Sequence, residues 1–175
     1  TKAFVAQMRH MVSRTYPTLR NNPDYTSIVN DKQYSRLQRY LDDARELGAE
    51  IIEINPAGEN LDGTRKIAPT LIVNATEVCQ EELFGPLFVV KEYDNIEQAI
   101  EYINDRPRPL AFYYFDYDDR RAEQLSRQTH SGHFGVNAVI THVAQDDLPF
   151  GGVGASGMGK YHGHEGFLTM SHARS

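Results

Sequence analysis

The clearest chemical pattern in the chain is the segment EELFGP, residues 81–86, which stands directly before an apolar run. A carboxylate in such a place, such as that of Glu82, accepts two hydrogen bonds from the hydroxyls of a sugar diol. The neighbouring ring of Phe84 can pack against a flat heterocycle. Exposed acids beside a Gly-Pro turn account for the segment equally well, because charged side chains are mostly solvated. The residues alone leave both interpretations open.

A glycine-rich stretch, PFGGVGASGMG (149–159), contains the pattern G-x-G-x-x-G at residues 152–157. That pattern holds a dinucleotide phosphate when a strand precedes it, a helix follows it and an acidic residue stands about 20 positions further on. Only 18 residues, 158–175, follow here, and glycines that disfavour a helix interrupt them. We therefore predict a tight, irregular loop in which glycine permits positive φ and close backbone approach, and no phosphate site.

Cys79 is the one thiol of the chain. A nucleophilic cysteine needs a depressed pKa, which a nearby cation or a helix N-terminus provides. The neighbouring acids Glu77, Glu81 and Glu82 act in the opposite direction, because negative charge disfavours the thiolate. We predict an inert thiol. A single cysteine also excludes an internal disulfide and suits a reducing compartment.

The C-terminal histidines His162, His164 and His172, together with Glu165, raise the alternative of a metal-dependent hydrolase. Two histidines in the pattern H-x-H lie on the same face of a strand. Glycines interrupt this segment, however, and it shows neither clear strand periodicity nor a defined third ligand. We predict ordinary polar histidines here and no metal ion.

The elements that must position these residues alternate in type along the chain. Apolar residues at helical spacing predict helices over 4–12 and 34–47, limited by Pro17 and Gly48. Asp94 and Glu97 form a capping box for a further helix. A polar helix is expected over 118–130, and β-rich runs predict strands at 50–54, 68–73, 87–93, 110–115 and 134–140.

The order strand, helix, strand, helix, strand between residues 87 and 140 is typical of a parallel sheet. We therefore predict an α/β fold, with a mainly parallel sheet flanked by helices on both faces and an irregular glycine-rich C-terminal segment. The apolar run at 110–115 indicates a strand buried on both faces. The expected core residues are Ile51, Ile54, Leu71, Val73, Val89, Ile100, Leu110 and Phe112.

The composition limits the class of protein. The 175 residues, 40% of them hydrophobic, suffice for a domain with its own core. The net charge of −6 and the lack of a basic stripe argue against a nucleic-acid partner. No apolar run approaches the roughly 20 residues of a membrane span, and the chain opens without a signal-peptide pattern. We expect a cytoplasmic protein without a membrane span.

Several separated motifs in a fixed order resemble the aldehyde dehydrogenase superfamily, and in particular its class 3 branch. They are QEELFGPLFVV (80–90), LPFGGVGASGMGKYHGHEGF (148–167) and SHARS (171–175), while IAPTLIV (67–73) and RPRPLAFYYF (106–115) fit the same template. The resemblance covers essentially the whole chain. Within the branch, the chain is most similar to the bacterial coniferyl-aldehyde type.

This resemblance implies an oxidoreductase that converts an aldehyde into a carboxylic acid with NAD or NADP. In the family a cysteine thiolate attacks the carbonyl, hydride passes to the nicotinamide, and a glutamate activates the water that releases the acid. By correspondence of motifs, Glu82 binds the nicotinamide ribose and Phe84 contacts the nicotinamide. Phe150 lines the aldehyde tunnel, and His142 and Asn137 belong to the wall of the substrate pocket.

The resemblance also implies that the nucleophilic cysteine, the general-base glutamate and the dinucleotide-binding domain lie upstream of Thr1. Residues 1–175 are then the C-terminal portion of a catalytic domain, hold no catalytic residue, and do not oxidise aldehydes alone. The expected partners are the aldehyde, the missing N-terminal half and a second copy in a homodimer. The alternative is a truncated relative that serves as a non-catalytic binding module. Aromatic and long-chain aldehydes both stay open as substrates.

Overall fold

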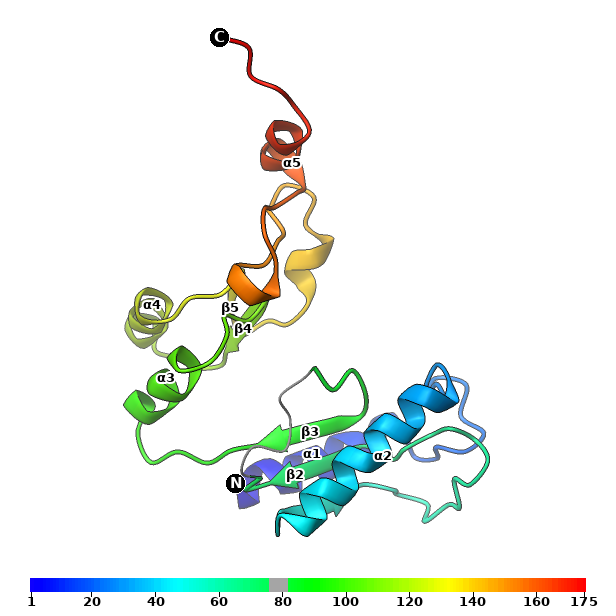
Figure 1. Cartoon of the computed structure of the whole chain (residues 1–175). Coiled ribbons are helices and arrows are strands. Elements are labelled where there is room, and N and C mark those ends of the chain that lie inside the picture. The colour runs from blue at the N-terminus through cyan, green and yellow to red at the C-terminus, as the bar shows by residue number, and fades with distance from the viewer. Residues whose placement is uncertain (76–81) are drawn as a thin grey trace. The chain divides into compact units, whose positions relative to one another are not determined.

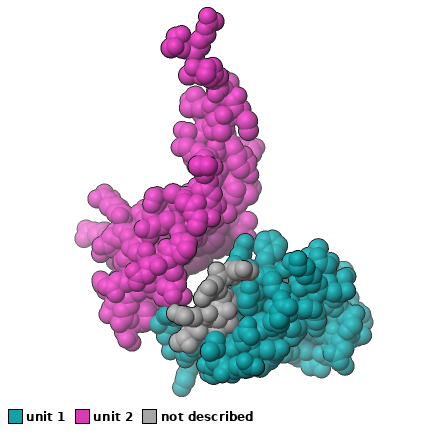
Figure 2. All heavy atoms as spheres, in the orientation of Figure 1, with its two compact units in different colours: residues 1–92 teal, residues 93–175 magenta. Residues whose placement is uncertain are grey.

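The computed structural model describes residues 1–75 and 82–175, which form two compact units, Thr1–Glu92 and Tyr93–Ser175 (Figure 2). Each unit contains its own small sheet. Cys79 and Glu81, for which the sequence predicts an inert thiol and an acidic turn, lie outside the described residues.

The first unit is built on a three-stranded sheet (Figure 1). Its strands follow the order β1-β2-β3, with β1 antiparallel to β2 and β2 parallel to β3. The register places Leu71 of β2 between Ile52 of β1 and Phe88 of β3. The elements of this unit are α1 (Lys2–Thr15), α2 (Asp31–Glu46), β1 (Glu50–Glu53), β2 (Thr70–Val73) and β3 (Leu87–Val90).

Side chains that alternate along the strands give this sheet two apolar faces, and a helix covers each of them. The cluster on the α2 side consists of Leu37, Leu41, Ala44, Ile67, Ile72 and Leu87. The cluster on the α1 side consists of Ile52, Ile54, Leu71 and Val73, with Val5, Met8 and Val12 packed against it. The predicted helices on both faces are therefore confirmed for this unit.

Helix α2 ends before Gly48 as predicted but begins at Asp31, three residues before the predicted start at position 34. The Asn30 side chain accepts a hydrogen bond from the Gln33 backbone N–H at 2.9 Å, which is the arrangement of an N-cap. At the other end Gly48 takes a left-handed φ of +79°, which glycine adopts without steric penalty. Leu37 and Leu41 face the core. The neighbouring Arg36 is thereby placed where its guanidinium reaches the backbone carbonyl of Glu82.

The second unit contains a parallel pair of strands joined by a helix (Figure 1). Parallel strands need a crossover connection, and α4 supplies it with Ala122 and Leu125 buried. This βαβ arrangement confirms the α/β class. The elements are α3 (Ile96–Asn104), β4 (Ala111–Tyr114), α4 (Asp119–Gln128), β5 (His133–Val136) and α5 (Gly163–Thr169), with 3-10 turns at Thr141–Ala144 and Gly154–Ser156. Over residues 1–75 and 82–175, no helix has the length and apolar character to cross a membrane.

Two local predictions are wrong in detail. The strands between residues 87 and 140 belong to two sheets, because β3 pairs with β2 whereas β4 pairs with β5. Helix α3 is capped one residue later than the Asp94–Glu97 box implies. Asn95 accepts from the Gln98 N–H at 3.1 Å, and the Gln98 side chain accepts from the Asp94 N–H at 2.9 Å. The helix therefore begins one residue later than the Asp94–Glu97 box implies, with Asn95 as its N-cap and Ile96 as its first residue.

The predicted core is correct for Ile54, Leu71 and Val73 but wrong for Val89 and Leu110, which are 36% and 40% exposed. Strand β4 is half-buried along its length and not buried on both faces. An apolar run indicates side chains that avoid water, but it does not specify the element that covers them. Val89 lies on β3, an edge strand of its sheet, where such cover is smaller.

Candidate functional site

A cavity of about 740 Å³ lies in the first unit and brings together the two predicted cofactor-binding residues, Glu82 and Phe84. Most of the remaining lining comes from the loop between α1 and α2, residues 16–29, which we call the wall loop. Gln33 and Ile67 complete the lining together with the Gly85-Pro86 turn. The volume falls in the range of about 300–1,000 Å³ that is usual for small-molecule sites.

Arg36 of α2 fixes the main chain beneath Glu82 and Phe84. Its guanidinium donates to the carbonyl oxygens of Glu82, at 3.0 Å, and Leu83, at 2.5 Å. The Nε–H of Arg36 also donates to Gln33 Oε1 at 2.7 Å. The planar fork of the guanidinium holds two successive carbonyls in one geometry. The backbone is therefore held from the core side while the side chains of Glu82 and Phe84 stay exposed.

Phe84 adopts a left-handed φ of +47°, which is uncommon for a bulky residue, and the residue is 83% exposed. Such a conformation costs of order 1–3 kcal/mol and persists only where the surroundings enforce it. Part of that enforcement comes from Gly85, which packs on the buried Leu37 so closely that a Cβ there would lie 2.5 Å from Leu37 Cδ1. The fold thus presents an apolar ring to the cavity at a measurable cost.

The carboxylate of Glu82 is exposed, and it forms no hydrogen bond or ion pair with a residue in the described part of the chain. Both of its oxygens therefore keep their capacity to accept hydrogen bonds. An accepting carboxylate two residues from an exposed aromatic ring suits a ligand that carries hydroxyl groups beside a flat ring.

The second unit contains a cluster of stacked rings around the predicted substrate residue His142. His142 is 7% exposed and stacks on His133, with ring centroids 3.7 Å apart and planes 4° from parallel. Phe150 lies on it at 5.7 Å and Tyr113 meets it edge-on at 5.8 Å. Burial lowers the pKa of His133, and the adjacent His142 lowers it further. The structure therefore brings two of the three predicted substrate residues, His142 and Phe150, into contact.

The ring nitrogens of His142 are an exception to the rule that buried polar atoms are paired. Both Nδ1 and Nε2 are buried and have no hydrogen-bond partner among residues 1–75 and 82–175. An unpaired buried polar group costs about 1–3 kcal/mol. A histidine held at such a cost is a candidate functional residue, since buried polar groups are otherwise almost always hydrogen-bonded.

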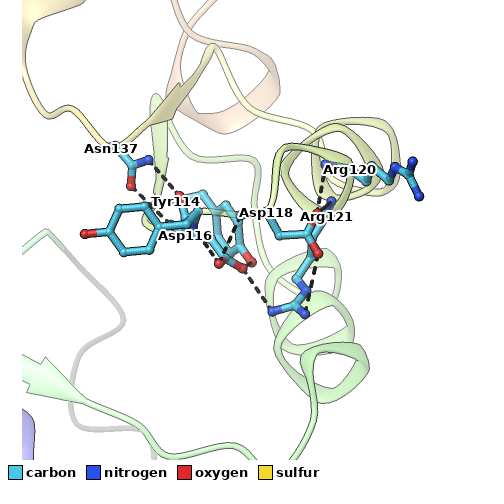
Figure 3. A network of polar contacts seen from close by, with 7 residues as sticks. Tyr114, Asp116, Asp118, Arg120, Arg121 and Asn137 are labelled. Atoms are coloured by element: carbon cyan, nitrogen blue, oxygen red, sulfur yellow. Dashed lines mark hydrogen bonds and ion pairs between the residues drawn. The ribbon is translucent and has the colours of Figure 1, made fainter.

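Asn137, the third predicted substrate residue, is engaged elsewhere (Figure 3). Its Oδ1 accepts from the Asp116 N–H at 3.1 Å and its Nδ2 donates to the Asp116 carbonyl at 2.7 Å. The Asp116 carboxylate in turn accepts from the Tyr114 hydroxyl at 2.6 Å and from Arg121 at 2.9 Å. These contacts tie the residue after β5 to the end of β4. The amide of Asn137 therefore positions the chain leading to His142, and its role toward a substrate stays a prediction.

The glycine-rich stretch forms a packed turn, as predicted. The Ser156 hydroxyl accepts from the Val153 N–H at 2.9 Å, and the Gly157 N–H donates to the Gly154 carbonyl at 3.3 Å. These N–H groups are therefore not available to a phosphate. At Gly151 and Gly152 an added Cβ would collide with the backbone of Gly159 and Ser156, so close approach explains the glycines.

A helix does form after this stretch, which the glycine content argued against. Helix α5 includes Gly163 and Gly166. A Cβ added to Gly166 would lie 3.4 Å from the carbonyl carbon of Tyr161. The helix thus forms despite the low helix propensity of glycine. His162 precedes this helix at a positive φ of 76° and His164 lies within it, so they do not form the same-face pair of a strand. The described residues contain no group of three or more His, Cys, Asp or Glu side chains that could hold a metal ion.

Two contributors were missed from the sequence, Arg36 and His133. The carbonyls that Arg36 binds lie 46 and 47 positions further along the chain, and no local pattern marks such a contact. His133 stands directly before the strand predicted at 134–140, and only the fold shows that it meets His142. Both residues act through tertiary contacts, which short-range motifs do not contain.

Comparison with known families gives the class of protein to which this α/β fold belongs. The aldehyde dehydrogenase family model matches residues 1–175, which is the whole chain. The chain belongs to the aldehyde dehydrogenase family. The resemblance drawn from its motifs is therefore confirmed, including the assignment to the class 3 branch.

The particular relatives point to one part of this family. The chain is 52% identical to the coniferyl aldehyde dehydrogenase of Pseudomonas sp. strain HR199, over 98% of this chain and 37% of the relative. It is 50% identical to the probable coniferyl aldehyde dehydrogenase of Pseudomonas aeruginosa, over 98% of this chain and 36% of the relative. Aldehyde dehydrogenase family 3 member A2 of the mouse is 40% identical, over 98% and 34%. The chain thus spans little more than a third of the length of these relatives.

Solved structures give the same result. The substrate-bound state of Staphylococcus aureus AldH superposes with a TM-score of 0.85 at 34% identity, and the match covers 98% of this chain and 37% of that one. A Mycobacterium tuberculosis aldehyde dehydrogenase in complex with NAD⁺ superposes with a TM-score of 0.70 at 31% identity, over 80% of this chain and 29% of that one. The α/β fold is therefore that of the aldehyde dehydrogenases.

Proposed function

We propose that the protein carrying this chain oxidises an aldehyde to a carboxylic acid with NAD or NADP as the cofactor. The observation that carries the proposal is that the exposed Glu82 carboxylate and the exposed Phe84 ring line one cavity on a backbone fixed by Arg36. Support comes from relatives named as coniferyl aldehyde dehydrogenases and from a related enzyme solved with NAD⁺.

The residues of this cavity fit a nicotinamide nucleotide. The Glu82 carboxylate accepts hydrogen bonds from the two ribose hydroxyls, and the Phe84 ring packs against the nicotinamide side. When bound, NAD or NADP supplies the acceptor for hydride. The fixed main chain at residues 82 and 83 limits where the carboxylate can lie before the cofactor arrives, which reduces the entropy that binding costs. The nucleophilic cysteine, the general-base glutamate and the dinucleotide-binding domain are proposed to lie outside residues 1–175.

The ring cluster of the second unit is the proposed wall of the aldehyde pocket. Phe150 and His142 form this wall, and Asn137 positions the segment that carries His142. Stacked aromatic and imidazole rings favour an aromatic substrate, which supports coniferyl aldehyde or a similar aromatic aldehyde over an aliphatic one. We further propose that the protein is a homodimer in the cytoplasm, and sedimentation of the purified protein tests the dimer.

Substitutions at Glu82 and Phe84 test this function in the product of the complete open reading frame. We expect Glu82→Gln to raise the cofactor KM about tenfold, because a neutral amide replaces a charged acceptor. Phe84→Ala should also raise it, through loss of ring contact. Glu46→Gln and Phe115→Ala, at exposed positions that are not among the residues lining this cavity, are matched controls that should leave the KM unchanged. Unchanged cofactor KM values in both Glu82→Gln and Phe84→Ala would exclude the proposed site.

A further inference from the structure

The wall loop supplies much of the cavity lining, yet residues 16–29 form no helix or strand. A loop without regular hydrogen bonding takes its position from contacts made by other elements. Two charged side chains that are distant in sequence, Glu59 and Lys66, make such contacts at the start of the loop.

Lys66 reaches the loop from the buried side. Its side chain belongs to a residue that is only 8% exposed, and its Nζ donates to the carbonyls of Leu19 at 2.7 Å and Asn22 at 3.0 Å. The ammonium also stands over the ring of Tyr25, 5.9 Å from its centroid. A buried ammonium is costly unless it is paired, so these contacts specify where the loop must lie.

Glu59 holds the same turn by accepting hydrogen bonds from the N–H groups of the turn. Its Oε2 accepts from the backbone N–H of Leu19 at 2.5 Å and of Arg20 at 3.1 Å. These two hydrogen bonds, aided by the positive charge of Lys66, keep the pKa of the Glu59 carboxyl below its usual value. Carbonyl groups are thus held by a cation and N–H groups by an anion within four residues. Both kinds of main-chain group are satisfied by one pair of opposite charges.

The contacts continue from this turn to the cavity. The Tyr25 hydroxyl donates to the carbonyl of Ile67, the residue after Lys66, at 2.5 Å. The ring of Tyr25 meets that of Tyr16 edge-on at 5.0 Å. All three of these residues line the cavity that contains Glu82 and Phe84. Displacement of the Leu19–Asn22 turn would therefore move Tyr25 and open this wall.

We propose that Lys66 and Glu59 are positioning residues that hold the wall loop of the cofactor cavity in its binding conformation. The inference rests on the proposed function, because it takes the Glu82–Phe84 cavity as the cofactor site. Neither residue lines the cavity beside Glu82 and Phe84, so they act on cofactor affinity through the loop and not through the reacting atoms. A loop that is only partly in its binding conformation weakens apparent affinity by the populated fraction.

Lys66→Met tests the proposal in the product of the complete open reading frame. Methionine has a similar length and suits a buried site, so the variant retains packing while it loses the cation. We expect the Kd for NAD to rise about tenfold, with kcat at saturating cofactor within twofold of the parent. In the absence of cofactor, amide hydrogen exchange of residues 19–28 should be faster in Lys66→Met than in the parent protein. Lys32→Met, an identical change at an exposed lysine of α2, should alter none of these values.

A second variant, Glu59→Gln, retains the shape of the side chain and removes its charge. It should raise the Kd for NAD less than Lys66→Met does, with the same increase in amide hydrogen exchange of residues 19–28. The proposal is overturned if exchange in residues 19–28 is unchanged in both variants, or if exchange rises while the Kd for NAD stays within twofold. Glu82→Gln, measured alongside, separates the two claims. If Glu82→Gln weakens binding and Lys66→Met does not, only the positioning role fails; if Glu82→Gln and Phe84→Ala have no effect, the cavity itself is not the cofactor site.

Discussion

A single methyl group at position 85 should disturb both the core and the cavity wall. In Gly85→Ala the new Cβ would lie 2.5 Å from Leu37 Cδ1, 3.0 Å from Cδ2 and 3.3 Å from Cγ. Leu37 is fully buried in the α2 cluster, so it has little room to move. Insertion of a methyl group into a packed core costs about 1–3 kcal/mol. We expect a loss of this size in the free energy of unfolding.

A double-mutant cycle measures whether this contact is the cause. Leu37→Ala alone should cost about 2–5 kcal/mol, because it leaves a cavity. That cavity can accept the methyl of Gly85→Ala, so the double variant should be more stable than the sum of the two losses predicts, by about 1–3 kcal/mol. Urea unfolding followed by far-ultraviolet circular dichroism gives the free energies.

A matched control places the same methyl where it fits. Gly166 of α5 has ordinary φ, and an added Cβ would meet its nearest neighbour at 3.4 Å, a normal contact. Gly166→Ala should therefore be neutral or stabilising by up to about 1 kcal/mol. Strict additivity of Gly85→Ala and Leu37→Ala would refute the packing argument, and so would equal effects at positions 85 and 166.

Three further outcomes follow from the second unit. Burial and His142 lower the pKa of His133 below 6.5, so the unfolded chain takes up the proton first and the unit should lose stability as pH falls below 6.5. Thermal unfolding measured at several pH values tests this. His133→Phe should flatten the dependence of the unfolding temperature on pH below 6.5. His142→Phe should raise the free energy of unfolding by about 1 kcal/mol, because it removes two unpaired buried nitrogens. A fall in aldehyde turnover in the same variant would show that the imidazole has a function. Marked destabilisation would contradict the argument that the buried nitrogens are unpaired. Asn137→Ala should cost about 1–3 kcal/mol in urea unfolding, since two hydrogen bonds to Asp116 are lost at a positive φ, and a loss below 0.5 kcal/mol would contradict the network.

Local motifs predicted the parts of the site that lie close together in the sequence. Glu82 and Phe84 share a cavity because a turn of the chain presents both, and their types alone suggested a ligand with hydroxyls and a flat ring. Helix α2 and strand β2 were likewise expected from periodicity and β-rich composition, and both occur where predicted. Such features depend on neighbours within a few residues, which the sequence contains directly.

The features that the sequence did not predict depend on distant contacts. Arg36 holds carbonyls on a segment far along the chain, and Lys66 holds a loop 44 to 47 positions before it. Val89 and Leu110 are exposed because an apolar pattern does not specify what covers it. Tertiary packing decides each of these cases, and no short pattern reports it.

The central claim, that the Glu82–Phe84 cavity receives the nicotinamide half of the cofactor, is tested most directly by saturation-transfer difference NMR with NAD on the product of the complete open reading frame. We predict that protein saturation reaches the nicotinamide ring and the protons of its ribose, and that this transfer falls markedly in Phe84→Ala but not in Phe115→Ala. Strong transfer to the nicotinamide that is unchanged in Phe84→Ala would contradict this claim, because the nicotinamide would then be bound by other residues.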